Sequence, residues 1–173
     1  CDLYVLELSS FQLETTNSLK AAAATVLNVT EDHMDRYVDL EDYRQAKLRI
    51  YHNAETAVVN LEDKLTFGEG ENQAKKVVSF AENQADYWLK TENGKQYLMA
   101  KEEVILPCDE AILVGRHNYM NILAATALAQ AVGINLEAIR TELRQFKGLD
   151  HRFQLAHQAN GVRWINDSKA TNV

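Results

Sequence analysis

Residues 3–14 read LYVLELSSFQLE, and this stretch decides how the rest of the chain is interpreted. Residues 3–6 form a continuous apolar run, which is typical of a strand covered on both faces in a parallel sheet. Glu7 interrupts the run at its carboxyl end, where the ligands of open α/β sheets bind. A carboxylate in that place can hold a cation, although a strand-end Glu that meets only solvent explains the pattern equally well.

The composition is that of an ordinary globular protein. Of the 173 residues, 46% are hydrophobic, the net charge is −7, and Lys and Arg never cluster beyond a pair. A nucleic-acid partner is therefore not expected, since such partners need basic patches. Because no apolar run approaches the roughly 18 residues that span a bilayer, we expect a cytoplasmic protein with no membrane insertion. The two cysteines, Cys1 and Cys108, are too few for a disulfide framework.

Beyond the first run, strand-like and helix-like segments alternate. Residues 21–29, 56–60 and 76–80 are rich in β-favouring side chains and predict three more strands. Residues 40–53 carry apolar side chains at helical spacing behind Asp39, a residue type that caps helices. The alternation predicts an α/β fold with a Rossmann-like, mostly parallel sheet flanked by helices.

Beyond residue 60 the alternation continues at first and then gives way to other patterns. An acidic segment at residues 61–63 predicts a short helix start, and short alternating runs over residues 85–106 predict a small antiparallel meander on the sheet edge. An Asn-Gly pair at 93–94 is a hairpin signal within that meander. A long Ala-rich helix is predicted from Gly115 to about residue 132, followed by a second helix over residues 136–146.

Residues 147–149 read Lys-Gly-Leu and resemble a domain boundary. Beyond them, two strand-like runs flank the turn signal Asn160-Gly161. The chain starts at Cys1 inside a strand-like pattern and stops in a polar run, so we expect a piece of a longer protein. Residues 1–148 would then form one domain, and residues 149–173 the beginning of the next domain.

Some polar residues suggest chemistry by their position. Lys47 shares the inward face of its predicted helix with Tyr43 and Ile50. Its ammonium group either reaches water along that face or, if desolvated, becomes a neutral, reactive amine. Asn118 and Asn121 lie three residues apart near the start of a helix, where they either cap the helix or read the edge of a heterocycle.

Six motifs, in the same order, resemble the Mur ligase family of cytoplasmic peptidoglycan synthesis. They are LELSSFQLE (6–14), NVTEDHMDR (28–36), YRQAKLRIY (43–51), GRHNYMN (115–121), GLDHRF (148–153) and NDSKATN (166–172). The last is the most discriminating, because the members that add other residues to the muropeptide look different there. The resemblance implies an ATP-dependent ligase that joins D-glutamate to UDP-N-acetylmuramoyl-L-alanine through an acyl phosphate.

The resemblance also implies a metal site. Glu7, His33 and Lys47 would hold two Mg²⁺ ions near the ATP γ-phosphate and the substrate carboxylate. Lys47 would be carbamylated by CO₂, which turns its amine into an anionic ligand. A neutral amine is needed for that modification, and desolvation of Lys47 would favour it.

The remaining site residues are implied in the same way. Asn118 and Asn121 would contact the adenine side of ATP, Arg152 its phosphates and Asp167 its ribose; Lys169 and Thr171 would contact the nucleotide and D-glutamate, and Ser9 and Ser10 the muramoyl substrate. The parent enzyme would act as a monomer.

The family's Gly-rich phosphate loop is missing from this sequence, in which no G-x-x-x-x-G-K-[ST] occurs. We therefore expect the 173 residues alone not to turn over substrate. Three alternatives remain open: a related ligase such as folylpolyglutamate synthetase, a non-catalytic nucleotide-binding piece, and a two-metal hydrolase built on Glu7, His33 and Lys47.

Overall fold

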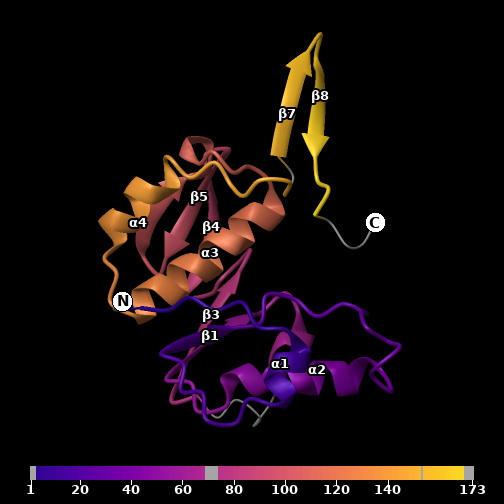
Figure 1. The fold of residues 1–173 in the computed structure, drawn as a ribbon. Helices are drawn as coiled ribbons and strands as arrows, with labels where there is room; N and C mark the ends of the chain where they lie inside the picture. The colour runs from indigo at the N-terminus through magenta and orange to yellow at the C-terminus, as the bar shows by residue number, and fades with distance from the viewer. Residues whose placement is uncertain (1–2, 69–73, 153, 170–173) are drawn as a thin grey trace.

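The computed structural model describes residues 3–68, 74–152 and 154–169. Its centre is a six-stranded sheet in the order β1-β2-β3-β4-β5-β6, accompanied by a separate two-stranded sheet, β7-β8 (Figure 1). The strands are β1 (Ala23–Thr25), β2 (Thr56–Asn60), β3 (Lys76–Ala81), β4 (Tyr87–Glu92), β5 (Lys95–Ala100), β6 (Glu103–Pro107), β7 (Gln154–Ala159) and β8 (Val162–Asn166). The pairs from β1 to β4 are parallel and those from β4 to β6 antiparallel. The predicted α/β sheet with an antiparallel meander at its edge is confirmed.

Helices cover both faces of the sheet (Figure 1). They are α1 (Ser10–Glu14), α2 (Leu40–Leu48), α3 (Arg116–Ala131) and α4 (Leu136–Leu143), with single 3-10 turns at Arg49–Tyr51, Lys64–Thr66 and Cys108–Glu110. Strand β2 is buried along its whole length and contributes to two cores. Val58 packs on the α3 side, whereas Ala57 and Val59 pack with Tyr51 on the α2 side. Within the described ranges, no helix has the length and apolar character of a membrane span.

The predicted hairpin turns are confirmed. Asn93 (φ 50°) and Gly94 (φ 75°) join β4 to β5, and Asn160 (φ 50°) and Gly161 (φ 75°) join β7 to β8. A two-residue turn with positive φ at both positions matches the twist of antiparallel strands, and Asn-Gly adopts it most readily. The β7-β8 hairpin stands off from the sheet beyond one end of α3 (Figure 1).

Residues 3–6 are not a strand, so the predicted first strand is wrong. The chain there is irregular and largely in solvent, with Val5 91% exposed. Directly afterwards, Ser9 and Gln12 form a capping box that starts helix α1 at Ser10: each side-chain oxygen accepts the other residue's backbone N–H. An apolar run is buried only where a neighbouring strand and covering layers exist, and no described strand pairs with this one.

Other element boundaries differ from the prediction by a few residues. Strand β1 spans only three residues of the predicted 21–29, because beyond it the N–H of Val26 donates to the hydroxyl of Tyr51 instead of to a strand. The helix predicted over 40–53 is α2 with a 3-10 turn, although Asp39 caps it as expected. The helix predicted over 136–146 ends at 143, and Asp63 caps a 3-10 turn where a helix start was predicted.

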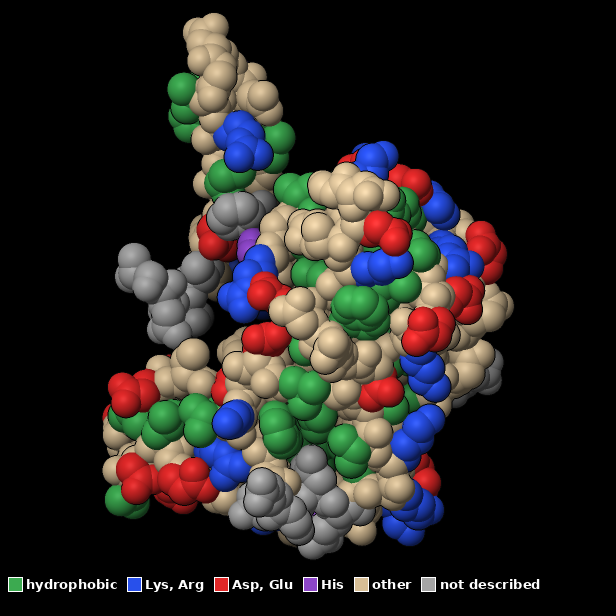
Figure 2. Space-filling view, turned by 180° about the vertical axis from the view of Figure 1, so that it is seen from behind, with side chains coloured by type: hydrophobic (Ala, Val, Ile, Leu, Met, Phe, Trp, Pro, Cys, Tyr) green, Lys and Arg blue, Asp and Glu red, His purple; other side chains and the backbone are tan. Residues whose placement is uncertain are grey.

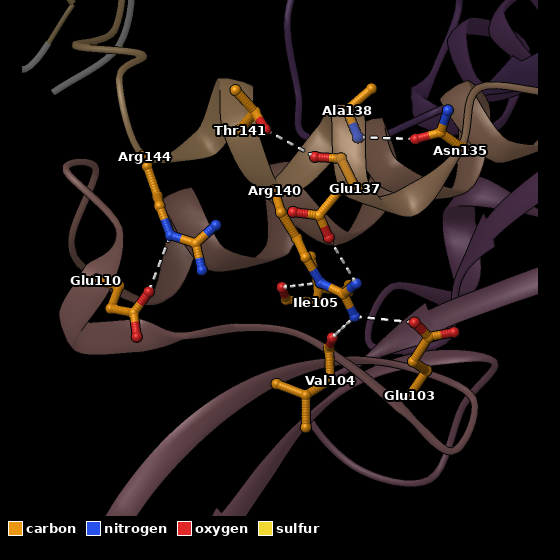
Figure 3. Close-up of polar contacts among 10 residues, drawn as sticks. All are labelled: Glu103, Val104, Ile105, Glu110, Asn135, Glu137, Ala138, Arg140, Thr141 and Arg144. Atoms are coloured by element: carbon orange, nitrogen blue, oxygen red, sulfur yellow. Dashed lines mark hydrogen bonds and ion pairs between the residues drawn. The ribbon is translucent and has the colours of Figure 1, made fainter.

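Arg140 ties helix α4 to the outermost strand of the sheet (Figure 3). Strand β6 carries a bulge opposite Leu98 and Met99, in which Ile105 is the extra residue. Bulges disrupt the hydrogen-bonded ladder. Arg140 Nε donates to the Ile105 carbonyl at 3.0 Å, Nη2 donates to the Val104 carbonyl, and two glutamates accept from the guanidinium as well.

The change Arg140→Met is expected to lower the free energy of unfolding by about 1.5–3 kcal/mol, because two edge-strand carbonyls lose a charged donor. Urea denaturation of the two proteins measures it. The side chain of Arg144, one turn further along, bonds among the described residues only to the exposed carboxylate of Glu110, so Arg144→Met should cost less than about 0.5 kcal/mol. Equal losses for the two variants would show that the strand contacts of Arg140 contribute nothing.

Candidate functional site

A cleft of about 820 Å³ lies between the β7-β8 hairpin, the first turns of α3 and the segment that follows α4. Four of the residues predicted to bind ATP line it: Asn118, Asn121, Arg152 and Asp167. Viewed from behind, basic and acidic side chains meet where the hairpin joins the body (Figure 2). The structure therefore brings together side chains that lie far apart in the sequence.

The remaining wall of the cleft is mostly apolar. Its apolar lining includes Ile122 on α3 and the paired Leu155 and Ile165 on the hairpin. A flat heterocycle fits between apolar side chains and is oriented by a few amides, such as those of Asn118 and Asn121. This arrangement can bind a base in its apolar part and a charged group at its rim.

Asn118 does not cap helix α3. The N-cap is Gly115 at φ 104°, and Asn118 lies three residues inside the helix. Its Nδ2 donates to the carbonyl of Val114 at 2.9 Å, which holds the amide at the cleft wall. The capping interpretation of Asn118 is therefore wrong, and the amide oxygen remains a candidate acceptor for a ligand.

A second cleft of about 530 Å³ adjoins the first and shares His117 and Asn121 with it. It lies at the carboxyl ends of β2 and β3, where Asn60 and Phe80 line it, and beside the N-terminus of α3. Ligands of open α/β sheets bind outside these strand ends. The two clefts thus meet at residues of α3, one on the side of the hairpin and the other at the sheet edge.

Sequence reasoning missed Arg163, which also lines the first cleft. The signal was available, because residues 163, 165 and 167 alternate along β8 and beyond it, and alternate residues of a strand share a face. All three line the cleft, whereas Trp164 faces away and packs against His157 with ring centroids 5.1 Å apart.

The predicted metal ligands are only partly assembled. His33 and Lys47 both border the Tyr43 ring: the His33 ring centroid lies 6.2 Å from it and Lys47 Nζ 4.9 Å. Lys47 is half-buried, with its ammonium over an aromatic face that favours a cation. Glu7 is exposed, and no described contact joins it to either residue. Among the described residues, no group of three His, Cys, Asp or Glu side chains could hold a metal ion, so a magnesium site here would need the additional carboxylate that carbamylation of Lys47 would supply.

Glu14, the last residue of helix α1, binds Arg36 and Tyr37 in the segment that follows His33, and we call these contacts the Glu14 clamp. Its carboxylate accepts from the Tyr37 hydroxyl at 2.6 Å and from the Arg36 guanidinium at 2.5 Å. The Tyr37 hydrogen bond and then the Arg36 hydrogen bond lower the pKa of Glu14 below its ordinary 4.5. Phe11 on α1 stacks on Tyr37 and lies 4.9 Å from the His33 ring, so the clamp also sets the position of His33.

We expect the Glu14 clamp to be pH-dependent. Because the folded-state pKa is lowered, its stabilisation is complete above about pH 4.5 and is lost as the pH falls through the folded pKa. Glu14→Gln should therefore lower the thermal midpoint at pH 7, and this deficit should shrink progressively as the pH falls below 4.5. Glu55→Gln, which disrupts an exposed pair with Lys75, is the control and should have little effect over the same pH range. A Glu14→Gln deficit that stays constant throughout an acid titration in which the fold persists would contradict the clamp.

The other predicted substrate residues lie elsewhere. Ser9 is engaged in the α1 capping box, and Ser10 is buried, at 3% exposed. Lys169 is exposed, and its backbone N–H donates to the carbonyl of His151 at 3.1 Å. Thr171 lies outside the described residues. None of the three described side chains lines the first cleft.

Curated proteins resemble the chain along its whole length. It is 90% identical over 173 residues to the UDP-N-acetylmuramoylalanine--D-glutamate ligase of Haemophilus influenzae strain PittEE, covering 100% of this chain and 40% of that protein. It is 73% identical over 172 residues to the ligase of the same name from Pasteurella multocida strain Pm70, covering 99% of this chain and 39% of that protein. The chain thus spans about 40% of the length of these relatives.

Solved structures share the fold. MurF from Acinetobacter baumannii superposes with a TM-score of 0.67 at 24% identity, covering 86% of this chain and 34% of that one. The UDP-N-acetylmuramate-alanine ligase MurC from Thermotoga maritima gives a TM-score of 0.67 at 25% identity, covering 92% of this chain and 36% of that one. The family model for the Mur ligase middle domain matches residues 1–129. The chain therefore belongs to the Mur ligase family.

Proposed function

We propose that the complete protein joins D-glutamate to UDP-N-acetylmuramoyl-L-alanine in an ATP-dependent reaction, and that this chain supplies part of its nucleotide site. The observation that carries the proposal is the 90% identity, over every residue of the chain, to a ligase named for that reaction. The cleft that gathers Asn118, Asn121, Arg152 and Asp167 supports it independently, since its apolar wall and polar rim suit a nucleotide.

The reaction proceeds in two steps. An oxygen of the substrate's terminal carboxylate attacks the γ-phosphorus of ATP, which forms an acyl phosphate and releases ADP. The amine of D-glutamate then attacks the acyl carbon, and the tetrahedral intermediate expels phosphate and leaves an amide. Catalysis of this kind needs positioning and neutralisation of charge more than a side-chain nucleophile.

Each cleft residue has a chemical task in this proposal. The amides of Asn118 and Asn121 orient the adenine, and the carboxylate of Asp167 accepts from the ribose hydroxyls. Arg152 holds phosphate oxygens with its planar guanidinium. Lys169 and Thr171 contact the nucleotide and D-glutamate.

The substrate-side residues have complementary tasks. Carbamylation of Lys47 would place an anionic group beside His33, and with Glu7 these residues would hold the Mg²⁺ that neutralises phosphate charge when bound. The Tyr43 ring, which Lys47 and His33 both border, keeps the two side chains near each other. Ser9 and Ser10 would contribute to the muramoyl side by positioning α1.

The arrangement in the complete protein follows from the same proposal. Residues 1–148 form a central ATP-binding domain, residues 149–173 begin the next domain, and the enzyme works as a cytoplasmic monomer. Gly148 supports this boundary, because at φ 87° it takes a backbone conformation that favours glycine, and a Cβ there would come within 3.0 Å of Leu113 Cδ2.

Phosphate release by the complete protein tests the proposal. We expect release to require ATP, UDP-N-acetylmuramoyl-L-alanine and D-glutamate together, and replacement of D-glutamate by L-glutamate or L-alanine to abolish it. The 173-residue chain alone should release none. Equal turnover with another amino acid would assign the protein to a related ligase, and nucleotide binding without turnover by the complete protein would make it a non-catalytic binding module.

A further inference from the structure

The arginines of this chain fall into two groups. Six of the eight have a side-chain partner: Arg36, Arg44, Arg116, Arg140 and Arg144 pair with glutamates, and Arg49 donates to the carbonyl of Leu13 and to neighbouring acceptors. Arg152 and Arg163 are the other two, and within the described ranges their guanidinium groups make no hydrogen bond or ion pair. Both line the same 820 Å³ cleft.

This lack of partners is not due to a shortage of carboxylates. The sequence holds 25 acidic and 18 basic residues, so most arginines find an anion readily. Along the cleft wall, however, the charged side chains are Lys147, Arg152 and Arg163 against a single carboxylate, Asp167. A positively charged concave surface on an acidic protein concentrates anions and speeds their capture.

The position of Arg163 is fixed by strand β8. Its register partner is Gln158 on β7, and it shares a strand face with Ile165 and Asp167. That face is the one that lines the cleft, while Trp164 between them lies on the opposite face. Arg163 is thus directed toward the ligand space by a strand pair, whereas Arg152 comes from the irregular segment before it.

We propose that Arg163 is a second anion-binding residue of this cleft, which acts with Arg152 on the phosphate groups of a bound nucleotide. The proposal rests on the nucleotide function proposed above. A guanidinium presents a planar fork of N–H donors that matches two phosphate oxygens, and such charge-assisted bonds are about twice as strong as neutral ones. Two unpaired guanidiniums on different elements hold a flexible polyphosphate better than one, because each fixes a different part of it.

Calorimetry on the complete protein with ATP, adenosine and inorganic tripolyphosphate tests the inference. Arg163→Ala should weaken the binding of ATP and of tripolyphosphate about tenfold or more, which is at least about 1.4 kcal/mol of binding free energy. The affinity for adenosine should not change. Arg163→Lys should give an intermediate loss for ATP and tripolyphosphate, because it keeps the charge and removes the fork. Arg144→Ala, which removes a paired arginine outside the cleft, should change none of the three.

The outcomes separate this inference from the proposed function. A loss of ATP binding in Asn121→Ala would show that ATP binds in the cleft. If Arg163→Ala then still binds ATP and tripolyphosphate as tightly as the parent protein, the inference is overturned and the proposed function stands. If tripolyphosphate binding depends on Arg163 while ATP binds no more tightly than tripolyphosphate, the anion site stands and the nucleotide function fails. Thermal melting of each variant shows whether a loss of binding is caused by unfolding. If Arg163→Ala is unfolded, Arg163→Lys is compared with the parent protein in its place.

Discussion

The change Lys47→Ala in the complete protein is expected to lower D-glutamate-dependent phosphate release by about a hundredfold to a thousandfold, the usual loss when one group that stabilises developing charge is removed. Lys47 is half-buried on α2, and its ammonium lies 4.9 Å from the Tyr43 ring centroid, beside His33 on the same ring. A carbamylated Lys47 would supply an anionic oxygen there, so the loss should be partly restored by small carboxylates added in solution.

The matched control for this prediction is Lys20→Ala, because Lys20 is exposed and lines neither of the two clefts described above. It should keep the parent activity. Mass spectrometry of the intact native protein in bicarbonate adds a direct readout, since carbamylation of Lys47 would add the mass of one CO₂ to the parent protein and not to the Lys47→Ala protein. A Lys47→Ala protein with parent activity would exclude any catalytic part for this side chain.

The change Tyr51→Ala is expected to be the most destabilising single substitution considered for this fold, at about 3–5 kcal/mol. Tyr51 is 0% exposed in the core between α2 and the sheet. Its hydroxyl accepts from the Val26 N–H at 2.9 Å and donates to the Val58 carbonyl at 3.3 Å, so it joins the chain beyond β1 to β2. Urea denaturation measures the loss, and Tyr51→Phe separates the hydroxyl from the ring with an expected cost of about 1–3 kcal/mol.

The Tyr51 hydroxyl also predicts a pH dependence. Burial raises its pKa from 10.0 to about 12. A raised folded-state pKa stabilises the fold fully below pH 10, and this contribution is lost as the pH rises toward 12. Tyr51→Phe should remove that part of the alkaline loss. A Tyr51→Phe protein with the same stability as the parent at pH 7 and the same alkaline profile would contradict the proposed hydrogen bonding.

The sheet could be predicted from the sequence wherever a pattern depends on interactions between residues that are neighbours in the chain. The βα alternation, the Asn-Gly turns at 93–94 and 160–161, and the cap at Asp39 all act through neighbouring residues, and all are confirmed. The strand expected over residues 3–6 failed because burial of an apolar run depends on distant partners. The capping box of Ser9 and Gln12 was the local signal that a helix begins there.

The candidate site was predictable in its residue types more than in its geometry. The motif resemblance selected Asn118, Asn121, Arg152 and Asp167, and the structure places them around one cleft. The expectation that Glu7, His33 and Lys47 form one site relied on a strand end at Glu7, and without that strand nothing fixes Glu7 beside the other two. Arg163 was missed although the alternation of residues 163, 165 and 167 was visible in the sequence, and only the folded chain shows that its guanidinium has no partner among the described residues.

The most direct test of the central claim is a crystal structure of the complete protein with a non-hydrolysable ATP analogue. We expect the base to lie against Asn118 and Asn121 in the cleft beneath the β7-β8 hairpin, the ribose at Asp167 and the phosphates within reach of Arg152. A nucleotide bound with none of these four side chains in contact would contradict the assignment of this cleft.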